Sequence, residues 1–192
     1  SKLADRYHAG GFMCRAMQSA DILEIHDFVQ SRSKIPMLSA ANYECGADGV
    51  AKDGVDAGAC LQIGAPGNAE NAYLQGRVCA EEGCALGTNW AFAPVVDLEY
   101  NWRNPIVGTR AYGKDPDFVA ACGTAYIRAV QERGMAASAK HFPGDGLDER
   151  DQHLVTSINS FSCEEWDATY GKVYRACIEE GVMTVMSGNI MQ

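Results

Sequence analysis

Short apolar segments alternate with helical segments along this chain, and this alternation constrains the fold more than any other feature. Four apolar segments are expected to be strands, at residues 35–41, 90–96, 135–139 and 182–186, and a further one lies within residues 7–15. Their centres, Met37, Ala91, Ala137 and Thr184, are spaced by roughly one strand–loop–helix unit each. Short, continuously apolar strands are typical of a parallel sheet covered on both faces. The pattern therefore predicts an α/β fold.

The segments between these strands carry signals for helix ends. Helices are expected at residues 19–30, 68–86, 116–133 and 162–180. Their N-terminal signals are the Asp21/Glu24 and Ser162/Glu165 capping-box patterns, Asn68, and Asp115 followed by Pro116. Glycines follow three of the expected C-terminal ends, at Gly87, Gly134 and Gly181. The Gly- and Ala-rich residues 48–67 are expected to form an irregular connection.

Polar residues follow each expected strand, and this favours one α/β architecture over another. They are Asn42 and Glu44, Asp97, Lys140 and His141, and Ser187 and Asn189. A TIM barrel uses all of its strand ends in this way, whereas a doubly wound sheet does so only near its switch point. A full barrel needs eight strands and about 250 residues. We therefore predict an incomplete (β/α)8 TIM-like barrel with parallel strands and about five or six βα units.

Residues 1–192 are expected to form a single domain, a partial TIM-barrel catalytic domain that lacks its first and last strands. Such a barrel has open sheet edges. A second chain, or a C-terminal part missing from this sequence, is a possible partner that would complete it.

Charge and composition limit the other partners. The chain is 47% hydrophobic, which suffices for a core, and its net charge of −9 would repel a phosphate backbone, so no nucleic acid partner is expected. The longest apolar runs, such as residues 90–96, are too short to span a bilayer, so no membrane partner is expected. The N-terminus lacks the apolar core of a signal peptide, which predicts a cytoplasmic location, although a processed N-terminus would look the same.

None of the eight cysteines forms a C-x-x-C pair. Buried free thiols are therefore expected, in preference to a disulfide framework or a zinc site.

Residues 140–153 (KHFPGDGLDERDQH) contain the densest group of protonatable side chains. Lys140 and His141 end a buried strand, where an unpaired cation is costly, so they should face a polar ligand or a carboxylate. Asp151 precedes His153 by two residues. An aspartate that accepts a hydrogen bond from one imidazole nitrogen sets the tautomer and raises the basicity of the other nitrogen. His153 and Asp151 are thus a candidate general acid/base pair, the alternative being a solvated surface loop.

Three other groups of polar residues can each be interpreted in two ways, as a ligand site or as part of the structure. Asp145, Asp148, Asp151, His141 and His153 are potential metal ligands. Their spacing fits neither an EF-hand nor H-E-x-x-H, so no metal or other cofactor is expected. The loop from Asn104 to Arg110 ends in a cation and is either a plain turn or a polar anchor for an oxygen-rich ligand. Asn42 and Glu44 either bond ligand hydroxyls or brace a loop.

In combination, these motifs resemble glycoside hydrolase family 3, specifically its β-N-acetylglucosaminidase branch. The resemblance includes residues 41–44 (ANYE), 91–97 (AFAPVVD), 104–116 (NPIVGTRAYGKDP), 139–144 (AKHFPG) and 151–153 (DQH), in the family's order. It implies a TIM-like barrel and a retaining, exo-acting hydrolase that releases β-linked N-acetylglucosamine from a small carbohydrate substrate.

The resemblance also implies roles for particular residues. His153 and Asp151 would form the loop acid/base dyad, and Lys140, His141 and Arg110 match positions that hold the sugar in the −1 subsite. Asn42 and Glu44 would add substrate contacts, with Asn42 at a position where the family often has an aspartate. Asp145 similarly replaces a second loop histidine, and Asn189 a strand-end histidine.

The nucleophile in the family is an aspartate on a later strand, beyond Gln192, so this chain alone is expected to be inactive. Two alternative functions stay open. A β-N-acetylglucosaminide phosphorylase is compatible with the sequence because a neutral imidazole repels phosphate less than a carboxylate does. A non-catalytic sugar-binding fragment is compatible with the missing nucleophile. The glycines Gly144 and Gly146 further suggest that the loop that carries His153 and Asp151, residues 144–153 (the dyad loop), is mobile.

Overall fold

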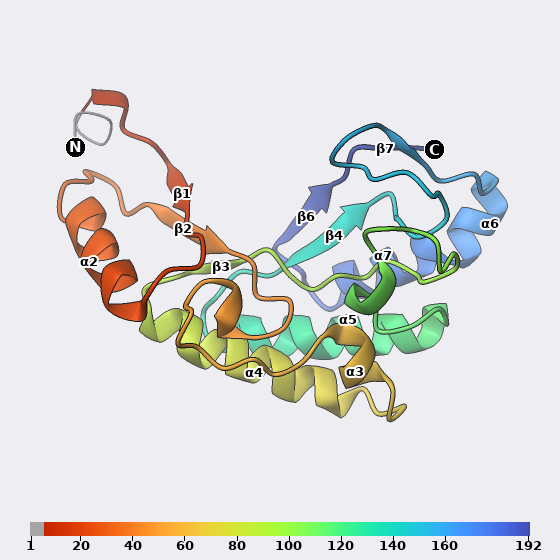
Figure 1. Ribbon diagram of the computed structural model, residues 1–192, viewed down its shortest axis with the longest axis horizontal. Helices are drawn as coiled ribbons and strands as arrows, with labels where there is room; N and C mark the ends of the chain where they lie inside the picture. Colours follow the sequence, from red (N-terminus) through yellow and green to blue (C-terminus); the bar gives the residue numbers. More distant parts are fainter. Residues whose placement is uncertain (1–5) are drawn as a thin grey trace.

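Strands and helices alternate in the computed structural model, which describes residues 6–192 (Figure 1). In chain order the elements are β1 (Gly11–Met13), α2 (Ser19–Gln30), β2 (Leu38–Ala41), η1 (Ala47–Gly49), α3 (Cys60–Gly64), α4 (Glu70–Ala85), β3 (Trp90–Ala91), η2 (Gly108–Arg110), α5 (Pro116–Gln131), β4 (Ser138–Phe142), β5 (Ser157–Ile158), α6 (Cys163–Ala168), α7 (Tyr170–Glu179), β6 (Thr184–Ser187) and β7 (Ile190–Met191). The predicted α/β class is confirmed.

The strands pair in parallel and in sequence order. β1 pairs with β2, β2 with β3, and β4 with β6. Parallel bridges from Trp90 to Ala136 and from Val95 to Lys140 join the β3 segment to the β4 segment. The order β1-β2-β3-β4-β6 is that of a barrel wall, since a doubly wound sheet reverses its strand order partway. β5 and β7 form a separate parallel pair.

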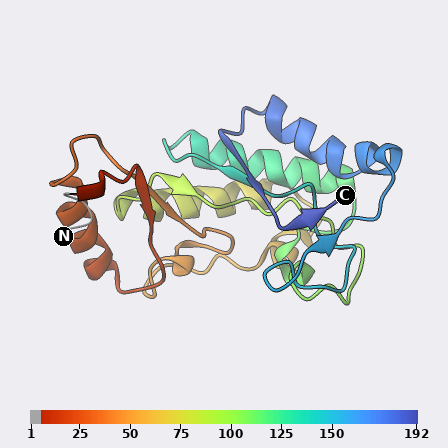
Figure 2. The ribbon, with the colours of Figure 1, turned by 90° about the horizontal axis from the view of Figure 1, so that it is seen from above.

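Helices α4, α5 and α7 pack along the outside of this wall, and Figure 1 shows α4 and α5 running below the strands. Small residues allow close packing there: a Cβ atom on Gly76 of α4 would lie only 2.9 Å from the carbonyl oxygen of Tyr126 in α5. Figure 2 shows the N-terminal and C-terminal parts at opposite ends of the long axis. The described strands therefore form an open arc.

Two helix starts follow the predicted local signals. The Asp115 carboxylate accepts a hydrogen bond from the Phe118 N–H at 2.8 Å, and Ser162 and Glu165 form a capping box. The expected single helix over 162–180 is nevertheless two helices, broken at Thr169. The Thr169 hydroxyl donates to the Glu165 carbonyl at 2.7 Å, and side-chain bonds of this kind compete with regular helix geometry.

The Asp21/Glu24 capping box is wrong, although α2 has the predicted bounds. Gln18 is the N-cap residue and its side chain makes no capping bond. Asp53 supplies the acceptor from a distant part of the chain, with its carboxylate 3.0 Å from the Ser19 nitrogen and 2.6 Å from the Ser19 hydroxyl. Residues 48–67 are also more regular than expected, because they contain α3.

All eight cysteines are free thiols, and five of them are buried. Cys45 is half-buried, and Cys84 and Cys163 are exposed, so the expectation of burial holds for most of them. Across residues 6–192, no helix combines the length and hydropathy needed to cross a bilayer.

Candidate active site

A polar cavity of about 390 Å³ lies where the chain leaves β2, β4 and β6. It is lined by Asn42, Glu44, Phe92, Arg110, Lys140, His141, Gln152, His153, Met186, Ser187, Gly188 and Asn189. Six of the seven candidate site residues from the sequence therefore meet in one cavity. The seventh, Asp151, contacts His153 directly.

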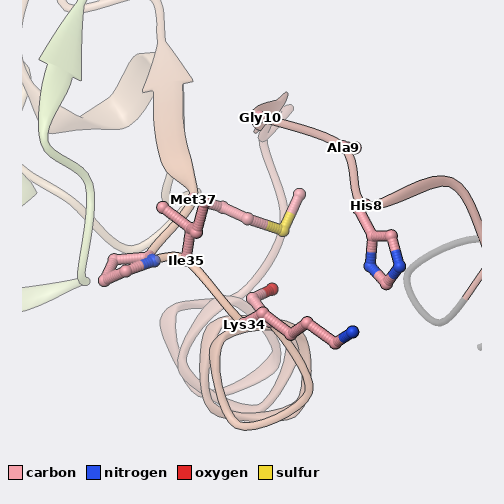
Figure 3. Close-up of a pocket in the computed structure, with 8 residues that line it drawn as sticks. His8, Ala9, Gly10, Lys34, Ile35 and Met37 are labelled. Carbon is pink, nitrogen blue, oxygen red and sulfur yellow. The ribbon is translucent and has the colours of Figure 1, made fainter.

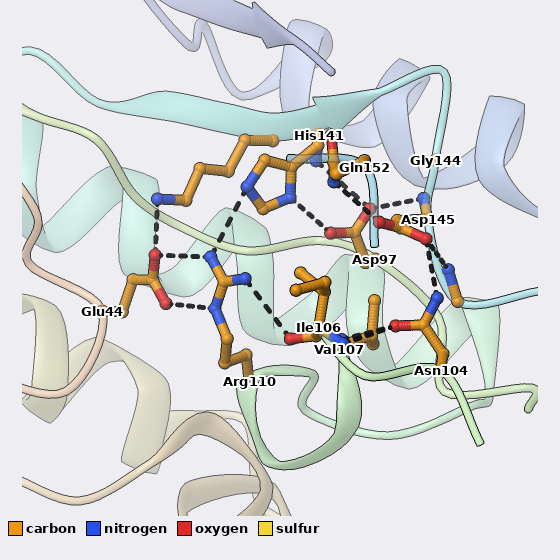
Figure 4. Close-up of polar contacts among 12 residues, drawn as sticks. Glu44, Asp97, Asn104, Ile106, Val107, Arg110, His141, Gly144, Asp145 and Gln152 are labelled. Carbon is orange, nitrogen blue, oxygen red and sulfur yellow. Dashed lines mark hydrogen bonds and ion pairs between the residues drawn. The ribbon is translucent and has the colours of Figure 1, made fainter. Parts of the chain in front are cut away.

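Glu44 holds two cations at the cavity wall (Figure 4). Arg110 donates from Nε and Nη2 to the two carboxylate oxygens at 2.8 Å each, and Lys140 Nζ lies 2.5 Å from Glu44 Oε1. Burial raises the pKa of Glu44, but the hydrogen bond from Arg110 and the charges of Lys140 and Arg110 outweigh it and lower the pKa to about 2. Burial lowers the pKa of Lys140, and Glu44 opposes that shift. The cluster thus holds one carboxylate against two basic groups.

Asp97 fixes the orientation of His141. Asp97 Oδ2 lies 2.6 Å from His141 Nδ1, and Oδ1 accepts hydrogen bonds from the backbone N–H groups of Asp145 at 2.8 Å and His141 at 3.2 Å. Burial opposes the charged form of Asp97, but His141 and these donors lower the pKa of its carboxyl. An ionised Asp97 keeps the imidazole proton on Nδ1, which leaves Nε2 as an acceptor. This Nε2 lies 3.5 Å from Arg110 Nη2.

The loop dyad has the geometry expected of an oriented imidazole. Asp151 Oδ1 lies 2.7 Å from His153 Nδ1 and accepts the His153 backbone N–H at 2.8 Å. The backbone and side-chain hydrogen bonds from His153 lower the pKa of Asp151. The carboxylate therefore keeps a proton on Nδ1 and leaves Nε2 as the nitrogen that can exchange a proton at the cavity.

Polar side chains hold the dyad loop against the neighbouring loop, residues 99–113. Asn104 Nδ2 donates to Asp145 Oδ1 at 2.9 Å and to the Asp148 carbonyl at 2.8 Å, and Asn101 Nδ2 donates to the Leu147 carbonyl at 2.9 Å. Asp145 is buried, and both burial and the charge of Asp97 raise its pKa. Hydrogen bonds therefore anchor this loop, in addition to the packing of Leu147 against the core.

The two loop glycines have a packing role. Gly144 and Gly146 have φ values of +126° and +113°. A Cβ atom at Gly144 would overlap the Tyr170 ring, and one at Gly146 would overlap the Leu98 carbonyl. Glycine is needed at these positions because only it combines positive φ with such close approach. This differs from the flexible role that the sequence suggested for them.

Among residues 6–192, no group of three or more His, Cys, Asp or Glu side chains is arranged to hold a metal ion. Two of the possible ligands are engaged elsewhere, because Asp145 accepts from Asn104 and Gln152, and Asp148 accepts from Arg150.

Sequence reasoning missed four residues of this site: Asp97 as the partner of His141, and Asn104, Asp145 and Gln152 as supports of the loop. Asp97 did carry a signal, because it follows an expected strand. Gln152 had none, because a glutamine within an acidic loop predicts an exposed side chain, yet it is only 5% exposed.

A second cavity, of about 320 Å³, lies at the opposite end of the strands (Figure 3). His8, Gly10, Lys34 and Ile35 are among its lining residues, and they precede β1 and β2. Active sites of barrels lie at the C-terminal ends of the strands, so this cavity is not the candidate site.

Parallel strands in sequential order, outer helices and a polar cavity at the strand ends define a partial (β/α) barrel with a strand-end ligand site. Residues 3–192 match the family model described as "Glycosyl hydrolase family 3 N terminal domain", and the chain belongs to glycoside hydrolase family 3. The family and the TIM-like fold inferred from the sequence are thereby confirmed.

Individual relatives support this assignment. A protein from Cellulomonas fimi named β-N-acetylglucosaminidase/β-glucosidase is 48% identical over 184 residues, which cover 96% of this chain and 33% of that protein. The structure of a β-glucoside phosphorylase, BglX, is similar with a TM-score of 0.92 and 38% identity, covering 96% of this chain and 34% of that one. A family 3 β-N-acetylglucosaminidase from Paenibacillus sp. FPU-7 gives 0.90 and 30%, covering 99% and 38%. The chain thus spans about a third of the length of these proteins.

Proposed function

We propose that the protein containing this chain is a retaining, exo-acting glycosidase that releases β-linked N-acetylglucosamine. This chain would contribute the acid/base and much of the −1 subsite. The observation that carries the proposal is the opening of an Asp-oriented imidazole, His153, onto the same cavity as the Glu44–Arg110–Lys140 cluster. The resemblance to the Paenibacillus β-N-acetylglucosaminidase supports the choice of sugar.

The buried cluster is suited to binding sugar hydroxyls. The Lys140 ammonium has three donors and, within residues 6–192, Glu44 as its carboxylate partner, so it can donate to a hydroxyl oxygen as well. His141 Nε2 is an acceptor in the tautomer that Asp97 imposes, so a hydroxyl that displaces its 3.5 Å contact with Arg110 Nη2 can donate to it. Asn42 is exposed at the cavity wall and offers both a donor and an acceptor.

His153 would transfer protons in both halves of the reaction. As an imidazolium it donates the Nε2 proton to the glycosidic oxygen while the bond to the sugar breaks. As a neutral base it then takes a proton from the water that releases the sugar. Asp151 orients the ring through Nδ1–H and stabilises the imidazolium in the first half. The nucleophilic carboxylate is expected from outside this chain, because Asp97 is fully buried and engaged by three donors.

The test is His153→Ala in the complete protein that contains this chain. Loss of a general acid slows cleavage of the glycosidic bond most when the leaving group most needs a proton, so kcat/KM, which reports that first step, should fall by roughly 10²–10⁴-fold on alkyl or disaccharide substrates. On aryl glycosides with acidic phenols the fall should be much smaller. His8→Ala is a matched control, because His8 is exposed and lines the cavity at the opposite end. Equal losses on both substrate classes would exclude the acid role.

A phosphorylase is the second candidate, favoured by two observations. The acid/base is an imidazole rather than a carboxylate, and the Glu44 cluster holds two basic groups against one acid, so the site repels a phosphate acceptor less. The neighbour named β-glucoside phosphorylase shares 38% identity. Incubation in phosphate buffer should then yield a sugar 1-phosphate, detected by ³¹P NMR. If free sugar were the sole product, the phosphorylase would be excluded and the hydrolase would be supported.

A further inference from the structure

Gln152 occupies an unusual place between the two dyad residues. Its side chain is buried, whereas those of Asp151 and His153 are 28% and 62% exposed. Gln152 Nε2 donates to Asp145 Oδ2 at 2.7 Å, and Gln152 Oε1 accepts the Asn189 backbone N–H at 3.1 Å. Its backbone carbonyl accepts Asn189 Nδ2 at 3.3 Å. One residue therefore ties the C-terminal part of the dyad loop both to Asp145 at the start of that loop and to the turn between β6 and β7.

Gly188 provides the space for this side chain. A Cβ atom at Gly188 would lie 2.6 Å from Gln152 Oε1 and 3.2 Å from His141 Cβ. The amide of Gln152 is thus packed between the β6–β7 turn and the residue that ends the buried part of β4. A larger residue at position 188 would push it out.

Asp145 is a rigid partner for the amide. Its backbone N–H donates to Asp97, and its carbonyl accepts the Tyr170 hydroxyl at 2.7 Å. Its Oδ1 accepts from Asn104 and from the Gly146 backbone, which leaves Oδ2 for Gln152. Figure 4 shows the Gln152 side chain directed toward Asp145, beside Asp97 and His141.

We propose that Gln152 is a positioning residue for the acid/base, a clamp that holds the His153 imidazole over the cavity. The inference rests on the proposed role of His153. Breaking the clamp releases the loop at its centre, and a displacement of about 1 Å at a reacting group can cost about 10²-fold in rate. The sugar-binding cluster does not depend on Gln152, because Glu44, Arg110 and Lys140 bond one another.

A reversal of the hydrogen-bond polarity tests the clamp in the complete protein. Gln152→Glu places a second carboxylate against Asp145 and should lower kcat/KM, which reports cleavage of the glycosidic bond, about 10- to 100-fold on substrates with poor leaving groups. The loss on activated aryl glycosides should be much smaller, and KM should change little. In the double variant Gln152→Glu/Asp145→Asn, the amide introduced at position 145 can donate to the carboxylate introduced at position 152. That carboxylate can still accept from the Asn189 backbone, so we expect most of the lost activity to return.

Gln131→Glu is a matched control. The Gln131 amide likewise donates to one group and accepts from another, the Gly181 carbonyl and the Met183 N–H, at the other end of the barrel. The Gln131→Glu variant should show the same dependence of the rate on the leaving group as the wild type.

Three outcomes would overturn the clamp: equal loss on both substrate classes, a change confined to KM, or no rescue in a double variant that melts like the wild type. If Gln152→Glu fails to fold, Gly188→Ala displaces the same amide and must reproduce the leaving-group pattern. If His153→Ala lacks that pattern, the proposed function fails. If His153→Ala shows it and the Gln152 variants do not, only the clamp fails.

Discussion

The basic side chains at the end of β4 each lie against a carboxylate from another segment. Lys140 contacts Glu44 and His141 contacts Asp97, because a buried charge without a partner would be costly. Their position at the end of an apolar segment was enough to predict that they face a ligand or a carboxylate. The partner Asp97 lies 44 residues away, and only the tertiary fold brings it close. Sequence position thus identifies the residues that need partners without identifying the partners.

Glu44 should give the protein an acid-sensitive stability. Its pKa of about 2 lies below the ordinary value of 4.5, so the folded state favours the ionised form. The resulting stabilisation, about 3 kcal/mol, is fully present above pH ~4.5 and is lost as the pH falls toward ~2. Glu44→Gln should lower the free energy of unfolding at pH 7 and flatten its dependence on pH in that window. Urea denaturation from pH 3 to 7 measures both.

Glu24→Gln serves as the control for this experiment, because Glu24 is exposed on α2. If Glu44→Gln kept the full acid dependence of the wild type, the stabilisation would have to come from another carboxylate.

At the scale of elements, helix ends were predictable where the partner is local. Asp115 caps α5 three residues before Phe118, and Ser162 and Glu165 cap α6 over the same spacing. For α2 the bounds were as predicted but the capping residue was wrong, because Asp53 reaches the first turn from a distant segment. Prediction also failed at Thr169, whose side-chain bond interrupts a continuous helical pattern. Local signals therefore predict where a helix begins more reliably than which residue caps it or where a side-chain bond interrupts it.

A pair of aspartates tests this difference between the two helix starts. Asp115→Ala removes a capping bond and should cost about 1 kcal/mol of unfolding free energy. Asp21→Ala should change it by less than about 0.5 kcal/mol, because Asp21 is a surface residue of α2 and does not cap it. Denaturant unfolding of both variants gives the comparison. If Asp21→Ala lowered the unfolding free energy as much as Asp115→Ala does, Asp21 would have to cap α2 after all.

At the scale of the whole molecule, the strand order and the incomplete barrel were predictable, but the side chains exposed at its open edge were not. Repeated strand–helix units imply neighbouring parallel strands, as observed. Closure depends on edges that no local pattern describes. Within residues 6–192, β1 pairs on one side only, and an apolar cavity of about 420 Å³ lies beside it, lined by Phe12, Met13, Leu38 and Trp90 among others.

The 192-residue chain expressed by itself should therefore self-associate. An open strand edge next to exposed apolar side chains favours pairing with another copy. Met13 and Leu38 are 46% and 50% exposed, and Met13→Lys or Leu38→Lys should reduce the association. Leu61→Lys should not, because Leu61 is exposed on α3, away from the strands. Light scattering over a concentration series measures the molar mass of the particle in solution. A monomer at every concentration would contradict the expectation.

The hydrogen bonds that support the dyad loop have a consequence for how such a protein diverges. Asn101 and Asn104 bond the carbonyl groups of Leu147 and Asp148, and the one loop side chain that Asn104 contacts in addition is that of Asp145, which is buried. Mutations at Glu149 or Arg150, which are exposed, leave that support in place. Substitutions can therefore accumulate there, so the exposed surface of the loop can change under selection while the backbone path that carries the proposed acid/base pair is inherited intact.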